Sequence, residues 1–350
     1  MLLSQPLLTP STALGPTWPA LIAPARTRFI VRHCHVRLCD DEDAALELFL
    51  SEPHPRVSAE EVSIAVSEGE RVDGSLSETT LLAAKQTLDE YGVVCLRGVW
   101  DAKPPLVNSL VGALEANYDA CIGLVGERSG LSADDSFGYR QIVHRSQGRY
   151  DMLLEDGVAA APLPSALRDS VLGGAWRREL LARLLGQDFK VEFTAALLAK
   201  SGCAPQDPHA DGAHPHQAEH DDDASSPLPP HALQLFLPLC EMSVAAGPTE
   251  FWPTSHLAEN APFASLLPSL PLEAAPGDAI VFDFRVIHRG MANTAGYARP
   301  ILYQTCTCAW FVDDFNFPVQ SLLDETEMGD VEWEQQIGVQ GARSRSGFVK

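Results

Sequence analysis

Three residues in the second half of the chain are of the types that bind a transition metal. His209 and Asp211 form a His-x-Asp triplet, and His288 ends the apolar run 279–288. In an extended segment, residues i and i+2 project to the same side, so His209 and Asp211 can offer an imidazole nitrogen and a carboxylate oxygen to one ion. A lone His-x-Asp is common by chance, and a histidine at the end of a strand is usually a packed core residue. A further residue is therefore needed to support a metal site.

Arg299 is that further residue, 11 positions after His288. The turn-like segment 293–296 lies between them, so we predict a hairpin that brings Arg299 onto the strand beside His288. Two histidines and one carboxylate form the facial triad of Fe(II) oxygenases, which leaves positions on the iron open. An arginine one strand away can bind the far end of a dicarboxylate that chelates the metal. We therefore interpret His209, Asp211 and His288 as catalytic iron ligands.

Segments around these residues carry a longer pattern. Residues 247–256 read Gly-Pro-Thr-Glu-Phe-Trp-Pro-Thr-Ser-His, residues 206–211 read Gln-Asp-Pro-His-Ala-Asp, and Asp283 precedes His-Arg-Gly-Met-Ala-Asn at 288–293. Together they resemble the phytanoyl-CoA dioxygenase (PhyH) family of Fe(II)/2-oxoglutarate-dependent oxygenases. The first segment is similar to the family's Gly-x-Thr-x-x-x-Pro-Gly-Ser-His, with Thr254 where glycine is usual. The others are similar to its two metal-ligand segments.

The resemblance covers residues 190–311 well and residues 78–189 only loosely. It implies a double-stranded β-helix core that is buttressed by helices. It also implies Fe(II), 2-oxoglutarate as co-substrate and O2, with ascorbate as reductant. The implied reaction converts 2-oxoglutarate to succinate and CO2 and hydroxylates a substrate.

The same resemblance assigns residues to the co-substrate. Gln206 would bond near the metal-bound 2-oxoglutarate, and Arg299 would pair with its distal carboxylate. Several members of the family have Ser or Thr two residues after the second histidine as another contact to that carboxylate, but here the residue is Gly290. We predict that Tyr303 or Thr194 takes over this contact.

The substrate side is less defined. Arg149 and Tyr150, with Arg145, form a polar, basic stretch in an acidic chain. This stretch is either a solvated surface or a wall of the substrate pocket, and as a wall it would contact a polar or anionic group of a small organic substrate. Halogenases of this architecture lack the carboxylate ligand, so Asp211 favours hydroxylation, or a desaturation or ring closure that follows the same hydrogen abstraction.

Two alternatives compete with the oxygenase interpretation. One is a catalytically inactive jelly-roll protein that binds a metal or another ligand, and the other is a cupin-type metal enzyme that does not use 2-oxoglutarate. The presence of all three metal ligands disfavours the first alternative. An arginine placed to bind a dicarboxylate disfavours the second.

The elements that must position these side chains are short strands with a few helices. Apolar or alternating runs separated by turns are typical of a β-sandwich or jelly roll, and they occur at 191–198, 232–239, 279–284 and 300–311. Apolar spacing predicts helices at 44–50, 78–91, 106–118 and 175–185, with a buried strand at 93–96. We therefore predict a mainly β fold with flanking helices, a double-stranded β-helix of the jelly-roll, cupin-like type.

The chain divides into a leader (1–40), an acidic extension (41–75) and an oxygenase domain (76–350) with an insertion loop at 212–230. The first 39 residues hold four Arg and no acid, which fits either an organellar targeting peptide or an unstructured leader. The protein is thus expected in the cytoplasm, or in an organelle if the leader is a transit peptide. The insertion contains His214, His216 and His220, and it is either a polar loop over the site or a second metal site.

The overall charge limits the partners. The chain of 350 residues has a net charge of -22, from 25 basic and 47 acidic residues. Such a surface repels phosphate backbones and anionic lipids, so nucleic acid and membrane surfaces are not expected partners. The expected partner is a small-molecule substrate, and the sequence predicts no particular oligomeric state.

Overall fold

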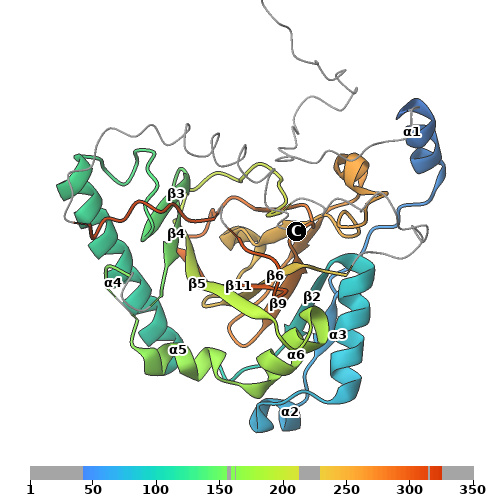
Figure 1. Ribbon diagram of the computed structural model, residues 1–350, viewed down its shortest axis with the longest axis horizontal. Helices are drawn as coiled ribbons and strands as arrows, with labels where there is room; N and C mark the ends of the chain where they lie inside the picture. Colours follow the sequence, from blue (N-terminus) through green and yellow to red (C-terminus); the bar gives the residue numbers. More distant parts are fainter. Residues whose placement is uncertain (1–41, 156–158, 162, 213–228, 314–315, 325–350) are drawn as a thin grey trace, which may run out of the picture.

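A computed structural model describes residues 42–155, 159–161, 163–212, 229–313 and 316–324 (Figure 1). The predicted leader and the histidines of the insertion loop lie outside the described residues. The helices are α1 (Glu42–Ser51), α2 (Glu68–Asp73), α3 (Glu78–Tyr91), α4 (Pro104–Ser129), α5 (Ser165–Leu172) and α6 (Ala175–Leu185), with 3-10 helices η1 (Val244–Ala246) and η2 (Ala261–Leu266). The strands are β1 (Ser63–Ala65), β2 (Val93–Arg97), β3 (Ile142–Ser146), β4 (Arg149–Leu153), β5 (Lys190–Ala199), β6 (Ala232–Pro238), β7 (Thr249–Phe251), β8 (Leu270–Leu272), β9 (Ala279–Asp283), β10 (His288–Gly290) and β11 (Arg299–Thr307).

The strands form two sheets. The large sheet has eight strands in the order β1-β2-β9-β6-β11-β5-β4-β3, and the small sheet has three in the order β10-β7-β8. Within them β1 and β2 pair in parallel and the other pairs are antiparallel. From β6 onward the chain passes repeatedly from one sheet to the other, as a double-stranded β-helix requires. The predicted fold class is therefore confirmed.

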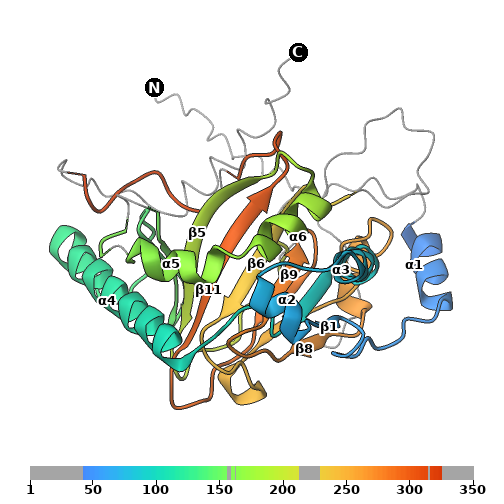
Figure 2. The ribbon, with the colours of Figure 1, turned by 90° about the horizontal axis from the view of Figure 1, so that it is seen from below.

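The two faces of the large sheet pack against different partners because side chains alternate along each strand. On β11, Leu302 and Cys306 belong to the apolar cluster shared with the helices. Ile301 and Tyr303, on the other face, belong to the cluster between the two sheets. Helices α3 to α6 cover the outer face of the large sheet (Figures 1 and 2). We call the face toward the small sheet the inner face.

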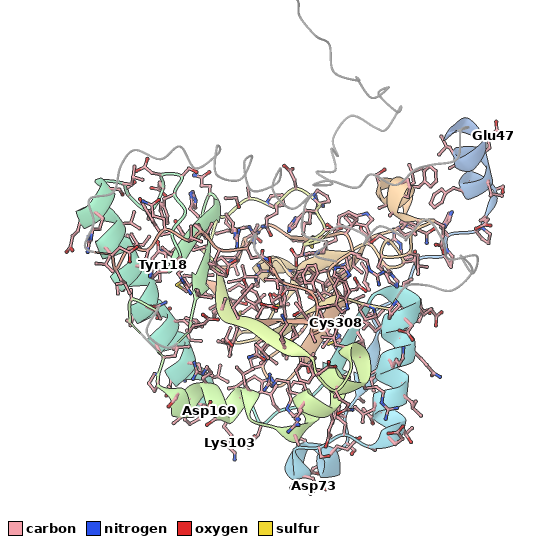
Figure 3. All side chains as sticks on the ribbon, in the orientation of Figure 1. Glu47, Asp73, Lys103, Tyr118, Asp169 and Cys308 are labelled. Atoms are coloured by element: carbon pink, nitrogen blue, oxygen red, sulfur yellow. The ribbon has the colours of Figure 1, made fainter. Side chains whose placement is uncertain are left out.

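Charged residues of the helical layer lie at the periphery. Figure 3 shows the exposed Glu47, Asp73, Lys103 and Asp169 at the outline of the molecule, while side chains crowd its centre. Among the described residues no helix has both the length and the apolarity to cross a membrane.

The predicted helices at 78–91 and 175–185 are observed with the same bounds. Ser77 caps α3 by accepting a hydrogen bond from the backbone N–H of Thr80, and Gly92 ends it at φ 76°, a conformation that favours glycine. The helix predicted at 106–118 is too short, because α4 continues to Ser129. Cys121 and Val125 extend its buried face.

The long strands agree with the prediction to within about two residues, except that β11 ends at Thr307 rather than at 311. The hairpin of β3 and β4 was not predicted, since its sequence reads as a polar, basic stretch. In the predicted extension, β1 is bonded to β2 and joins the large sheet.

Candidate metal and co-substrate site

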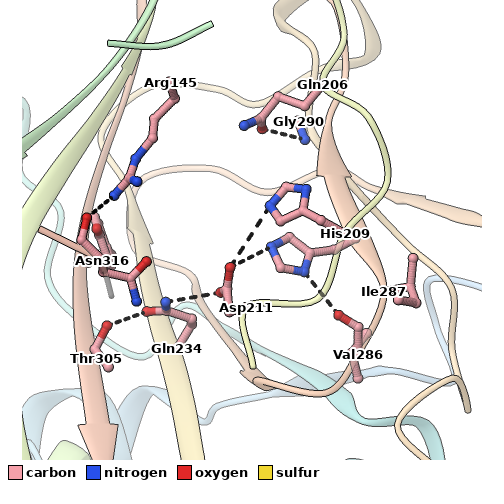
Figure 4. Close-up of polar contacts among 12 residues, drawn as sticks. Arg145, Gln206, His209, Asp211, Gln234, Val286, Ile287, Gly290, Thr305 and Asn316 are labelled. Carbon is pink, nitrogen blue, oxygen red and sulfur yellow. Dashed lines mark hydrogen bonds and ion pairs between the residues drawn. The ribbon is translucent and has the colours of Figure 1, made fainter. Parts of the chain in front are cut away.

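His209 and His288 face each other across a short antiparallel bridge. The backbone N–H of His209 donates to the carbonyl of His288 at 2.9 Å, and the N–H of His288 donates to the carbonyl of His209 at 2.8 Å. The Nε2 atoms of the two rings lie 3.9 Å and 3.7 Å, respectively, from Oδ1 of Asp211. One ligand atom from each of the three residues lies within 4.8 Å of the other two (Figure 4).

The hydrogen bonds of both imidazoles orient their rings for metal binding. Nδ1 of His209 lies 2.8 Å from the carbonyl oxygen of Asp207, and Nδ1 of His288 lies 3.0 Å from that of Val286. A carbonyl only accepts, so each Nδ1 carries a proton, and in the neutral ring this tautomer leaves the lone pair on Nε2. Burial and the neighbouring His288 lower the pKa of His209 to about 4, so this ring is neutral near pH 7.

The carboxylate of Asp211 is oriented from its other side. Gln234 Nε2 donates to Asp211 Oδ2 at 3.1 Å, and Thr305 Oγ1 donates to Gln234 Oε1 at 3.0 Å. These two hydrogen bonds leave Asp211 Oδ1 facing His209 and His288. Gln234 and Thr305 were not predicted, although a glutamine within the apolar run 232–238 is a signal that could have identified the first.

Two imidazole nitrogens and one carboxylate oxygen on one side of a point are the donor set of a facial iron triad. The residues present therefore fit a divalent iron. The packing around them is apolar on one side, where the ring of Phe282 lies 4.7 Å from that of His288. An apolar surround strengthens electrostatic interactions at the metal.

Arg299 lies buried between the sheets. Its side chain donates through Nη1 to the carbonyl of Gly247, while Nε has no hydrogen-bond partner among the described residues. Burial, and then the positive charge of Arg149, lower the pKa of Arg299 to about 10, so it remains cationic at pH 7. A buried cation without a carboxylate partner is costly and is suited to binding an anion.

The predicted hairpin between His288 and Arg299 is wrong. Strand β10 pairs with β7 in the small sheet, and Arg299 begins β11 in the large sheet. Residues 291–298 instead cross between the sheets. The buried side chain of Asn293 holds this crossover, because its Nδ2 donates to the carbonyls of Ala199 and Tyr297.

Gln206 lies beside the cluster of His209, Asp211 and His288. Its backbone N–H donates to the carbonyl of Gly290 at 2.9 Å, and the N–H of Gly290 donates to Gln206 Oε1 at 3.0 Å. The side-chain oxygen is thereby occupied, and the amide nitrogen is left to donate to a ligand.

Tyr303 is on the inner face, but its hydroxyl has a protein partner. It donates to the carboxylate of Asp151, with distances of 2.9 Å and 3.0 Å to the two oxygens. Asp151 also forms an ion pair of 2.7 Å with Arg145. Burial and the charge of Asp151 raise the pKa of Tyr303 well above 10, so the phenol keeps its proton. Asp151 was not predicted as a site residue.

Thr194 and Tyr150 are not brought to the site. Thr194 accepts a hydrogen bond of 2.9 Å from Gln304, and Tyr150 donates to the carbonyl of Ala133 at 2.8 Å and packs on Tyr118 of α4. Both lie on the outer face because they are one residue out of phase with their inner-face neighbours. Arg149, next to Tyr150, does face inward.

The fold and the cluster define a jelly-roll protein with a candidate non-haem metal centre. Residues 142–301 match the family model "Phytanoyl-CoA dioxygenase (PhyH)". The resemblance drawn from the motifs is therefore confirmed for this part of the chain, which matches the PhyH domain. The matched residues include His209, Asp211, His288 and Arg299.

Solved structures show similar chains. The α-ketoglutarate-dependent carbocyclase SnoK from nogalamycin biosynthesis is 17% identical, with 73% of this chain and 87% of SnoK covered and a TM-score of 0.44. AviO1 from Streptomyces viridochromogenes Tue57 is 19% identical, with 67% and 98% covered and a TM-score of 0.45. EctD from S. alaskensis with bound Fe is 17% identical, with 73% and 84% covered and a TM-score of 0.42.

Proposed function

We propose that this protein is a non-haem iron dioxygenase that hydroxylates a small organic substrate while converting 2-oxoglutarate and O2 to succinate and CO2. The observation that carries the proposal is the convergence of the Nε2 atoms of His209 and His288 and Asp211 Oδ1 at one point. The buried, cationic Arg299 with its free Nε supports a dicarboxylate as co-substrate.

Each residue has a defined task in this proposal. His209, Asp211 and His288 hold Fe(II), which when bound supplies the chemistry that activates O2. Arg299 pairs with the distal carboxylate of 2-oxoglutarate in a buried setting where a charge-assisted hydrogen bond is strong. Gln206 donates its amide N–H to the metal-bound end of the co-substrate.

The substrate would lie against Arg145, Asp151 and Tyr303. Arg145 keeps 25% of its side chain exposed while it pairs with Asp151. Its charge acts on both His209 and Asp211, so this wall lies within electrostatic range of the metal ligands. We infer that the wall contacts a polar group of the substrate. The presence of Asp211 favours hydroxylation.

Succinate formation tests the proposal. Protein purified without oxygen is given Fe(II), 2-oxoglutarate, ascorbate and O2, and slow succinate release without substrate is the expected result. His209→Ala removes a metal ligand and should abolish this turnover. His54→Ala is the matched control, because His54 bonds to the backbone of Phe49 and lies outside the cluster.

Arg299 gives a second test. Arg299→Ala should lose turnover at low 2-oxoglutarate and regain part of it at high concentration, since the metal-chelating end still binds. Arg177→Ala removes a half-buried arginine from the helical layer, where it bonds to Gln304, and should leave this dependence unchanged. If no succinate forms and calorimetry detects no 2-oxoglutarate binding to the metal-loaded protein, the catalytically inactive binding protein is the better conclusion.

A further inference from the structure

Arg149 places a guanidinium at the position that the side chain of residue 290 would occupy. A Cβ atom built on Gly290 would lie 2.5 Å from Arg149 Nη1 and 2.8 Å from Gln206 Oε1. Side-chain carbon atoms do not approach polar atoms this closely, so a larger residue 290 would have to displace the guanidinium of Arg149 and the amide of Gln206 from these positions. The absence of a side chain at Gly290 is therefore coupled to the presence of Arg149.

The hydrogen bonds of Arg149 leave one nitrogen for a ligand. Nε and Nη2 donate to the carbonyl of Ala204, and Nη2 also donates to those of Gly290 and Met291. These bonds fix the plane of the guanidinium in a buried position, with 4% of the residue exposed. Nη1, the atom beside Gly290, makes none of these bonds.

Arg149 and Arg299 lie in one row of the large sheet. Both are paired with Ala199, Arg149 from β4 and Arg299 from β11. They are therefore two strands apart, roughly 9–10 Å between backbones, and both project from the inner face. Among the residues that the structure describes, neither forms an ion pair with a carboxylate, and the charge of Arg149 lowers the pKa of Arg299. Two buried cations that repel each other favour an anion between them.

We propose that Arg149 is the second anchor of the co-substrate's distal carboxylate and takes the part that Ser or Thr two residues after the second histidine plays in related chains. Nη1 donates to one carboxylate oxygen while Arg299 binds the other. This inference rests on the proposed function. It assigns Arg149 to the co-substrate rather than to the substrate wall that the sequence predicts.

Calorimetry of two ligands tests the proposal in the anaerobic Fe(II)-loaded protein. The ligands are 2-oxoglutarate and 2-oxopentanoate, which has the same chain length but no distal carboxylate. The ratio of their Kd values measures the contribution of that carboxylate alone, and partial unfolding of a variant affects both ligands equally. Arg149→Ala should reduce the preference for 2-oxoglutarate about 10- to 100-fold, as expected for the loss of a hydrogen bond to a charged group.

The exchange between positions 149 and 290 gives a sharper test. Gly290→Ser alone should weaken 2-oxoglutarate binding, because the new Cβ displaces Arg149. In the double variant Arg149→Ala/Gly290→Ser, the guanidinium is gone and only the terminal amide of Gln206 has to shift away from the new Cβ, so the serine hydroxyl can donate to the carboxylate. The double variant should therefore prefer 2-oxoglutarate more strongly than Arg149→Ala does.

The outcomes separate this inference from the proposed function. If the wild-type protein does not bind 2-oxoglutarate, the proposed function fails. If the wild type binds it and Arg299→Ala loses the preference while Arg149→Ala keeps it, only the role of Arg149 is overturned. If the double variant and Arg149→Ala have equal ratios of the two Kd values, the serine at position 290 does not replace Arg149 as an anchor, and this exchange is contradicted. Arg149→Lys, which keeps the charge without the fork of donors, should retain an intermediate preference.

Discussion

The two faces of the large sheet are built from the same strands but differ in the side chains that they bury. The outer face is mainly apolar, and Leu235 and Leu302 pack there under the helices, while its buried Thr194 and Gln304 bond to each other. The inner face carries buried polar groups at alternate positions of the same strands, among them Gln234 and Arg299. The outer face has the composition of a core, whereas the inner face retains groups whose burial costs stability unless a ligand or a partner satisfies them.

This difference indicates how stability and function are separated in the fold. Substitutions on the outer face should change the free energy of unfolding and leave ligand affinities unchanged. Substitutions at the polar positions of the inner face should change ligand affinities and leave the free energy of unfolding nearly unchanged. One strand can serve both purposes because successive side chains point to opposite faces of the sheet and pack in different environments.

The largest effect on stability is expected from Leu110→Ala. Leu110 is fully buried on α4 against the outer face, so its truncation leaves a cavity and should cost about 2–5 kcal/mol of unfolding free energy. Urea unfolding measures the loss. Fe(II) affinity of the folded variant should equal that of the wild type, and a parallel loss of affinity would contradict the separation of the two faces.

The converse is expected from Asp211→Ala. Removing the one carboxylate of the cluster should lower Fe(II) affinity by more than about 100-fold, beyond the effect of losing a residue that only supports a ligand. Metal titration measures the affinity, and urea unfolding of the metal-free protein should change by no more than about 1 kcal/mol. Asp188→Ala, on the surface, serves as the matched control.

A smaller change in metal affinity is expected from Gln234→Leu. The hydrogen bond from Gln234 fixes Asp211 without touching the metal, so its loss should lower Fe(II) affinity by about 10- to 100-fold. Leucine suits the buried position, and the unfolding free energy should not fall by more than the about 1 kcal/mol expected for one hydrogen bond. An unchanged affinity would show that Asp211 is oriented without Gln234.

The smallest effect is expected from Tyr150→Phe. The change removes the hydrogen bond to the Ala133 carbonyl on the outer face and should cost about 1 kcal/mol of stability. The Kd of 2-oxoglutarate should stay the same. Tyr303→Phe is the inner-face counterpart, and it frees Asp151 from a donor near the substrate wall. A change in 2-oxoglutarate binding for Tyr150→Phe would place Tyr150 at the site after all.

The cluster of His209, Asp211 and His288 could be predicted because ligand chemistry restricts residue type and spacing strongly. The long helices and strands could be predicted for a similar reason, since caps and apolar periods extend over many residues. Strands β7, β8 and β10 have three residues each, too few to show a period. Their absence from the prediction led to the false hairpin between His288 and Arg299.

Residues whose role depends on the phase of a strand were harder to place. Arg149 and Tyr150 are adjacent, and without the bounds of β4 the sequence cannot tell which of them faces inward. Thr254 shows the reverse case. It stands where related chains have glycine, and it is the one non-glycine residue in the described part of the chain with a positive φ, at 69°. The backbone there requires the conformation that glycine adopts at least cost.

The crossover at residues 291–298 has a consequence for the choice of co-substrate. His288 belongs to the small sheet and Arg299 to the large one. The distance between the candidate metal site and the Arg299 guanidinium is therefore set by the spacing between the two sheets, not by the rise along one strand. That spacing is held by the aromatic core, where the rings of Phe251 and Phe282 lie 5.1 Å apart. Under the proposed function, discrimination between 2-oxo acids that differ by one methylene is therefore a property of core volume. Residues that never touch the ligand would set the length of dicarboxylate that fits.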